Sequence, residues 1–168
     1  LGIINPAIKA ELVSKETMEQ AVAIMTYLNR DARDAMQEIG VNGCTDITGF
    51  GLLGHAYEMA KASNVTIEIE SKKVPIIEEA IELGEMGLVP GGAYSNKGFI
   101  EDKITWLKDI PEIYKDLLFD PQTSGGLLIS VKEEKADALK LLLDRKVKTS
   151  FGVIGRVLPK GNNPLMVK

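Results

Sequence analysis

The stretch that most constrains this chain runs from Cys44 to His55 and reads CTDITGFGLLGH. It places one carboxylate, two hydroxyls, three glycines and the only histidine of the chain directly before an apolar helical pattern. A packed core does not need this mixture, whereas a loop whose backbone must approach an anionic, metal-bound ligand does. The stretch therefore predicts a ligand-binding loop that leads into a helix ending near residue 62.

The three glycines also spell the G-x-G-x-x-G pattern of a dinucleotide-binding turn. Gly49, Gly51 and Gly54 carry that pattern, and Glu70 follows near the expected separation of roughly 20 residues. In a dinucleotide-binding fold, however, a buried apolar strand comes before the first glycine. Here residues 42–48 are mostly small and polar, and a helical pattern precedes them. We therefore reject the dinucleotide interpretation.

The polar residues of the same stretch favour a magnesium and phosphate site. Magnesium is commonly held by one or two carboxylates together with substrate phosphates and water, which makes Asp46 a candidate ligand. Thr48 can cap a helix that starts at Gly49 or Phe50, and the free N–H groups of a first helical turn favour an anion. The competing interpretation is that Asp46 and Thr48 only cap the helix.

A second glycine-rich turn, Asp120 to Gly126, leads straight into a predicted strand over residues 127–131. Its last four residues offer adjacent N–H and hydroxyl donors for a small anion-binding concavity, although the segment could also be a simple tight turn. Three other residues have structural interpretations. We expect His55 to be a structural hydrogen-bonder, Cys44 a small buried apolar residue, and Asn96 part of a surface loop.

The hydrophobic pattern predicts helices mixed with half-buried strands. Residues 65–70 alternate apolar and polar side chains, and the continuous apolar strands of a doubly wound parallel sheet are missing. The predicted fold class is therefore α+β, with helices packed on a mixed, mostly antiparallel sheet. The predicted order is an extended segment 1–13, helix 15–39, the glycine loop and its helix, strand 65–70, helix 75–84, an aperiodic loop 88–103, helix 110–119, strand 127–131, helix 132–144, and a hairpin of strands 151–158 and 165–167.

The composition of the chain argues against several classes of binding partner. The 168 residues suffice for one domain, and a net charge of −4 without a dense Lys or Arg run argues against a nucleic-acid binder. Apolar runs are too short for a transmembrane helix, which argues against a membrane protein. A single cysteine excludes an intramolecular disulfide and fits a cytoplasmic setting. The first residue is Leu rather than Met, which suggests a fragment of a longer protein.

Three blocks resemble one enzyme family, selenophosphate synthetase (selenide, water dikinase), a relative of aminoimidazole ribonucleotide synthetase. They are Thr45–His55, Asp120–Leu128, and the loop Val89–Gly92 followed by Asn96. The resemblance implies that residues 14–168 are the C-terminal domain and residues 1–13 a lead-in from a missing N-terminal, ATP-binding, dimer-forming domain. The family converts ATP, selenide and water to selenophosphate, AMP and phosphate with Mg²⁺. The matched motifs place a metal ligand at Asp46 and a phosphate cleft at Thr48, Gly49, Gly51, Thr123, Ser124, Gly125 and Gly126.

The resemblance also has departures. The reactive Cys or selenocysteine of the family, its essential Lys and its other metal-binding Asp residues belong to the N-terminal half, so this chain carries no catalytic residue and is expected to be inactive alone. Ala93-Tyr94-Ser95 stands where a basic residue is expected beside Asn96. Two alternatives stay open. One is a related ATP-dependent synthetase with another acceptor, such as a purine precursor or thiamine phosphate, and the other is a non-catalytic nucleotide- or phosphate-binding module.

Overall fold

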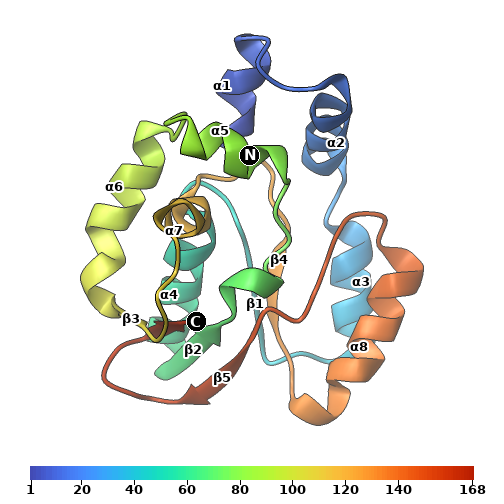
Figure 1. Ribbon diagram of the computed structural model, residues 1–168. Coiled ribbons are helices and arrows are strands. Elements are labelled where there is room, and N and C mark those ends of the chain that lie inside the picture. The colour runs from blue at the N-terminus through green and yellow to red at the C-terminus, as the bar shows by residue number, and fades with distance from the viewer.

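Six strands in two sheets carry the helices of this chain (Figure 1). The computed structural model describes residues 1–168. In chain order the elements are α1 (Ile4–Lys9), α2 (Lys15–Thr26), α3 (Arg30–Ile39), β1 (Gly43–Asp46), α4 (Gly51–Ser63), β2 (Val65–Ile69), the 3-10 turn η1 (Ser71–Lys73), α5 (Glu79–Glu85), α6 (Gly91–Ile100), the 3-10 turn η2 (Glu101–Lys103), β3 (Ile104–Trp106), α7 (Glu112–Phe119), β4 (Leu127–Ser130), α8 (Glu133–Lys146), β5 (Gly155–Pro159) and β6 (Leu165–Val167).

The larger sheet has the strand order β3-β6-β2-β5, and β1 and β4 form a separate antiparallel ribbon. Strand β2 pairs antiparallel with β5 and parallel with β6, and β3 pairs parallel with β6. The predicted α+β fold with a mixed sheet is confirmed, but the four-stranded sheet is not mostly antiparallel, because two of its three pairings are parallel. The predicted C-terminal hairpin is wrong, because β5 and β6 lie on opposite sides of β2. Alternation shows which face of a strand is buried but not which strand lies beside it.

Strand β2 is buried on both faces, not on one as its alternating pattern predicted. Thr66 and Glu68 are only 1% and 5% exposed. Each has partners that compensate for its burial. The Thr66 hydroxyl donates to the Asn163 carbonyl at 2.8 Å, and the Glu68 carboxylate accepts from Lys168 at 2.8 Å and Arg156 at 2.9 Å.

Two hydrophobic clusters hold the molecule together. The larger joins α4 to the four-stranded sheet and includes Leu53, Ala60, Ile69, Phe119 and Val167. The smaller joins the N-terminal segment to α2 and α5 and comprises Leu1, Ile3, Ile4, Ala7, Ala21, Ala80 and Leu83. Residues 1–13 are therefore not simply extended, since they contain α1 and contribute to the core. The domain boundary at residue 13 stays a prediction.

Two helical regions differ from the sequence prediction. The helix expected over residues 15–39 is two helices, α2 and α3, separated at Tyr27 to Asn29. Ser14 caps α2, with its hydroxyl accepting from the Thr17 amide at 3.1 Å. The region 91–100, expected as loop, forms α6, which buries only Ala93 and Ile100 and therefore shows little periodicity. Every helix falls short of the length and apolar character that crossing a membrane requires.

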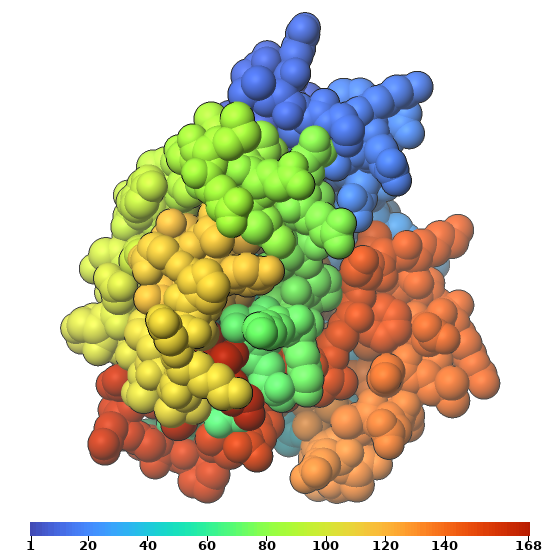
Figure 2. Space-filling model, in the orientation of Figure 1, coloured from blue at the N-terminus to red at the C-terminus, as the bar shows by residue number.

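Helices α3 and α8 pack side by side, beyond the β1–β4 ribbon from α4 and α6 (Figure 1). In the space-filling view, α8 (orange) stands beside the body formed by residues 70–120 (green to yellow) (Figure 2). The ribbon thus lies between the two parts of the molecule, and both glycine-rich turns are attached to its strands.

Candidate functional site

The two glycine-rich segments singled out in the sequence lie side by side. We call residues 46–51 the first glycine loop and residues 122–126 the second glycine loop. The first follows β1 and the second precedes β4, and these strands pair with each other. The Gln122 amide also donates to the Thr48 carbonyl at 2.9 Å. The fold therefore brings together two segments that are separated in the sequence by α4 to α7.

Close packing explains two of the glycines. Gly51 has a φ of +68°, and a Cβ atom there would lie 2.7 Å from the carbonyl carbon and oxygen of Phe119. A Cβ atom on Gly125 would lie 2.3 Å from the Ile47 carbonyl oxygen. Gly49 differs, since nothing lies within 4 Å of its Cβ position. Gly51 and Gly125 thus allow the loops to approach their neighbours, whereas Gly49 leaves its surface open to a ligand.

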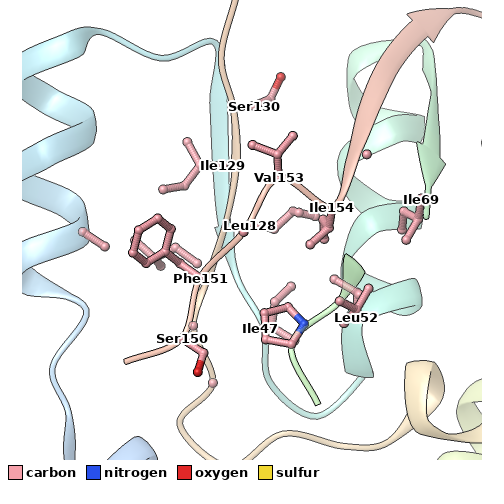
Figure 3. A pocket seen from close by; sticks show the side chains of 18 of the residues that line it. Ile47, Leu52, Ile69, Leu128, Ile129, Ser130, Ser150, Phe151, Val153 and Ile154 are labelled. Atoms are coloured by element: carbon pink, nitrogen blue, oxygen red, sulfur yellow. The ribbon is translucent and has the colours of Figure 1, made fainter. Parts of the chain in front are cut away.

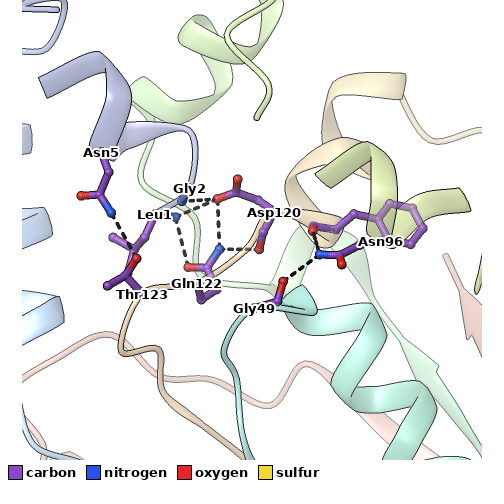
Figure 4. Close-up of polar contacts among 9 residues, drawn as sticks. Leu1, Gly2, Asn5, Gly49, Asn96, Asp120, Gln122 and Thr123 are labelled. Atoms are coloured by element: carbon purple, nitrogen blue, oxygen red, sulfur yellow. Dashed lines mark hydrogen bonds and ion pairs between the residues drawn. The ribbon is translucent and has the colours of Figure 1, made fainter. Parts of the chain in front are cut away.

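Two carbonyl groups of the first glycine loop, those of Thr48 and Gly49, are engaged inside the protein. The Thr48 carbonyl accepts from two amides, those of Gly51 at 3.0 Å and Gln122 at 2.9 Å. The Gly49 carbonyl accepts from Asn96 Nδ2 at 2.9 Å, as Figure 4 shows. These two acceptors of the first glycine loop therefore point into the protein.

Several N–H groups of the loops are not engaged, although those of Ile47, Gly51 and Gln122 are bonded within the loops. Those of Gly49, Phe50 and residues 123–126 donate to no other group of the chain. Most backbone N–H groups in folded proteins have a partner, and successive unpaired ones at a loop make a concavity that suits an anion. Ser124 contributes to this shape, because its φ of +55° lies in the left-handed region. The two loops are a candidate site for phosphate oxygens.

Asp46 and Thr48 do not cap α4, so the competing interpretation of these two residues is wrong. Helix α4 begins at Gly51, its N-cap is Phe50, and no side chain caps it. Asp46 ends β1 on its exposed face, and its carboxylate makes no hydrogen bond or ion pair within the chain. The Thr48 hydroxyl instead faces His55 Nε2 at 3.1 Å.

His55 is the structural hydrogen-bonder that the sequence suggested. Its Nδ1 lies 3.2 Å from a carboxylate oxygen of Glu58. An ionised carboxylate only accepts, so a neutral His55 donates from Nδ1 and accepts at Nε2 from the Thr48 hydroxyl. Thr48 therefore offers a ligand its oxygen lone pairs rather than its hydroxyl hydrogen.

The chain does not contain a complete metal site. No three His, Cys, Asp or Glu side chains are grouped closely enough to hold an ion. Asp46 nevertheless fits the role of one ligand in a shared site, because its carboxylate is exposed and free of protein partners. Carboxylate oxygen is the ligand type that Mg²⁺ prefers.

The predicted burial of Cys44 is wrong, because this residue lies on the exposed face of the short β1 strand. Nearby protein atoms still desolvate the thiol and Asp46 adds negative charge, so the pKa of Cys44 is raised above its ordinary value. A raised pKa keeps the thiol protonated and weakly nucleophilic. Cys44 thus supplies no reactive group to the site.

Asp120 fixes the start of the chain to the second glycine loop (Figure 4). The carboxylate is buried, and its Oδ2 accepts from the Leu1 and Gly2 nitrogens at 2.8 Å each and from Gln122 Nε2 at 3.1 Å. Asn5, on α1, donates from Nδ2 to the Thr123 hydroxyl at 3.2 Å. The 120–126 segment is therefore bonded to residues 1, 2 and 5 of the N-terminal segment. Sequence reasoning missed Asn5 because a single polar residue carries no pattern.

The molecule also contains an apolar groove of about 1320 Å³. It runs between the β1–β4 ribbon and the segment that leads into β5, and Ile47, Leu128, Phe151 and Ile154 line it (Figure 3). One end reaches the second glycine loop at Gln122. Its apolar lining suits neither phosphate nor a metal ion, so the candidate site is the pair of glycine loops.

Comparisons with known proteins agree with the motifs. The sequence profile of the family described as AIR synthase related protein, C-terminal domain, matches residues 6–168. The chain is 52% identical to the selenide, water dikinase of Caldanaerobacter subterraneus over 168 residues, covering 100% of this chain and 48% of that protein. It is 47% identical to the selenide, water dikinase of Clostridioides difficile, covering 99% of this chain and 48% of the relative. The chain thus spans about half the length of these curated relatives.

The fold also resembles a solved structure, that of thiamine monophosphate kinase from Aquifex aeolicus. The TM-score is 0.55 at 18% sequence identity, and the match covers 99% of this chain and 45% of that chain. At this identity the likeness shows the fold alone. The resemblance to selenophosphate synthetase that the motif blocks predicted is confirmed by the sequence comparisons.

Proposed function

The chain belongs to the AIR synthase related protein family, whose C-terminal domain it matches, and on that basis we propose that it is the C-terminal half of a selenide, water dikinase. The proposed reaction of the whole protein converts ATP, selenide and water to selenophosphate, AMP and phosphate. The observation that carries the proposal is the row of unpaired N–H groups beside the uncommitted carboxylate of Asp46. Relatives named selenide, water dikinase align along the entire chain and support the proposal.

In this proposal the glycine loops bind phosphate oxygens of the nucleotide. The N–H groups of Gly49 and Phe50 act with those of residues 123–126, and the Thr123 and Ser124 hydroxyls add side-chain donors. Gly51 and Gly125 contribute mainly by allowing the loops to pack closely, and the Gly51 N–H is already bonded to Thr48. Fixed donors placed where negative charge develops are an effective way to stabilise a transition state.

Asp46 would hold Mg²⁺ together with ligands from outside this chain. Magnesium bound to phosphate oxygens neutralises the charge that develops during phosphoryl transfer. We further propose that the missing half supplies the nucleophile, the remaining metal ligands and the ATP-binding loops. The whole protein would be a cytoplasmic homodimer.

Product analysis tests the proposal. The full-length protein, given ATP, Mg²⁺ and selenide, is expected to form selenophosphate, AMP and phosphate, and the 168-residue chain alone is expected to form none. AMP formation that ignores selenide but follows a purine precursor or thiamine phosphate would identify a related synthetase. Nucleotide binding without any turnover would identify a non-catalytic binding module, and either result would contradict the proposal.

A further inference from the structure

Two asparagines from distant elements hold carbonyl groups of the glycine loops. Asn96, on α6, donates from Nδ2 to the Gly49 carbonyl and to the Phe119 carbonyl, each at 2.9 Å (Figure 4). Asn29 lies where the chain breaks between α2 and α3, and its Nδ2 donates to the Gly125 carbonyl at 2.9 Å. Each asparagine thus binds the carbonyl of a peptide bond that follows a glycine, either Gly49–Phe50 or Gly125–Gly126.

Because a peptide group is planar, a hydrogen bond that fixes the direction of its carbonyl also fixes the direction of its N–H. The peptide bonds of this chain are all trans. A planar trans peptide points the carbonyl of one residue and the N–H of the next in opposite directions. Asn96 therefore turns the Phe50 N–H away from α6, and Asn29 turns the Gly126 N–H away from the α2–α3 break. Both N–H groups are among those without a partner in the chain.

Because the loops are rich in glycine, hydrogen bonds from outside the loops are needed to fix their peptide orientations. A glycine peptide can rotate through conformations that other residues avoid, so a loop rich in glycine does not fix its own N–H directions. Donors that must first turn toward an anion stabilise it less than donors already in place. The side-chain hydrogen bonds of both asparagines go to backbone carbonyls alone: Asn96 binds those of Gly49 and Phe119, and Asn29 binds that of Gly125 without capping α3 through its side chain.

We propose that Asn96 and Asn29 are positioning residues that preset the Phe50 and Gly126 N–H groups for phosphate oxygens of the nucleotide. This inference rests on the proposed function and assigns the orientation of its phosphate site to two side chains outside the glycine loops. Asn29 lies in the break between α2 and α3, and this break places its side chain beside the second glycine loop.

Kinetics of the full-length protein provide the first test. Asn96→Ala and Asn29→Ala are each expected to lower kcat/KM for ATP by about 10- to 100-fold, the usual cost of losing a supporting contact behind a ligand-binding group. The matched control is Asn163→Ala. Asn163 Nδ2 donates to the Thr105 hydroxyl at 3.1 Å in the four-stranded sheet and does not touch the glycine loops. The control is expected to lose stability and keep its kcat/KM.

Asn96→Asp adds a pH-dependent readout that a purely structural role would not give. Near neutral pH the new carboxylate faces two carbonyl oxygens and donates to neither. On protonation it can donate to one of them, which also raises its pKa above the ordinary value of about 4. The ratio of its kcat/KM to that of the natural protein is therefore expected to recover partly as the pH is lowered. If Asn96→Ala, Asn29→Ala and Asn96→Asp all keep the kcat/KM of the natural protein, the inference is overturned.

Amide chemical shifts separate this inference from the proposed function, because they require no turnover. In ligand-free full-length protein labelled with ¹⁵N-phenylalanine and ¹⁵N-glycine, Asn96→Ala is expected to shift the Phe50 amide and leave the Gly126 amide in place. Asn29→Ala is expected to do the reverse. If the natural protein forms no selenophosphate, the proposed function fails while this pattern still supports the positioning role. Amides that do not move in either variant would overturn it.

Discussion

Gly49 and Gly51 lie two positions apart in one loop, and the structure gives them different reasons to lack a side chain. Gly51 has a positive φ and touches the Phe119 backbone, whereas Gly49 faces open space. We expect Gly51→Ala to lower the free energy of unfolding by about 2–4 kcal/mol, because it adds backbone strain and a steric clash. Urea denaturation measures this change.

Gly49→Ala is the matched comparison at the residue scale. Nothing surrounds its Cβ position, so its free energy of unfolding is expected to stay close to that of the natural protein. Its affinity for nucleotide is expected to fall, because the added methyl group stands where a phosphate would approach the Gly49 and Phe50 N–H groups. Equal destabilisation by the two substitutions would show that the packing around Gly51 is not as described.

At the scale of the element, strand β2 contains the buried carboxylate of Glu68, and we expect its charged form to stabilise the sheet. Hydrogen bonds from Lys168 and then Arg156 hold the pKa of Glu68 below its ordinary value. A lowered pKa adds stability above the unfolded-state value of about 4.3, and this stability is lost as the pH falls through the folded-state pKa. We expect Glu68→Gln to cost about 1–3 kcal/mol at pH 7, with the difference from the natural protein closing in acid below about pH 4.

Denaturation curves recorded from pH 7 to pH 3 check this expectation. Glu70→Gln, one residue beyond the end of β2, is the control, since the Glu70 pKa is also lowered, by Lys73, but the pair is more exposed to water. Its effect is expected to be smaller than that of Glu68→Gln. A gap between Glu68→Gln and the natural protein that does not close in acid would contradict the assigned ion pairs.

The elements also show where sequence reasoning succeeds and where it stops. Glycines, hydroxyls and Asp46 in two short blocks predicted a phosphate and metal site, because those residue types have specific uses at a loop. The structure brings the two blocks side by side, and the site itself stays a prediction. Strand order was not predictable, since alternation is the same whether β5 and β6 pair with each other or with β2. Helix α6 was missed because it contains Gly91, Gly92 and Gly98 and buries few side chains. The contacts of Asn29 and Asn96 with glycine-loop carbonyls form only on folding, so the sequence did not indicate them.

At the scale of the whole molecule, the β1–β4 ribbon unites segments that the chain keeps far apart. One edge of the molecule therefore presents unpaired N–H donors and a free carboxylate together. This chain contains neither a complete metal site nor a cationic side chain bonded to either glycine loop. The chain spans about half the length of the curated relatives that it matches.

The most direct test of this account is the effect of Asp46→Ala in the full-length protein on two quantities, magnesium-dependent selenophosphate formation and the thermal unfolding midpoint. We predict that kcat/KM falls by about 100-fold or more, because a metal ligand is lost at the phosphates. The unfolding midpoint is predicted to stay unchanged, because the carboxylate is exposed and bonds to nothing in the chain. Full activity in this variant, or a large drop in its unfolding midpoint, would contradict the account.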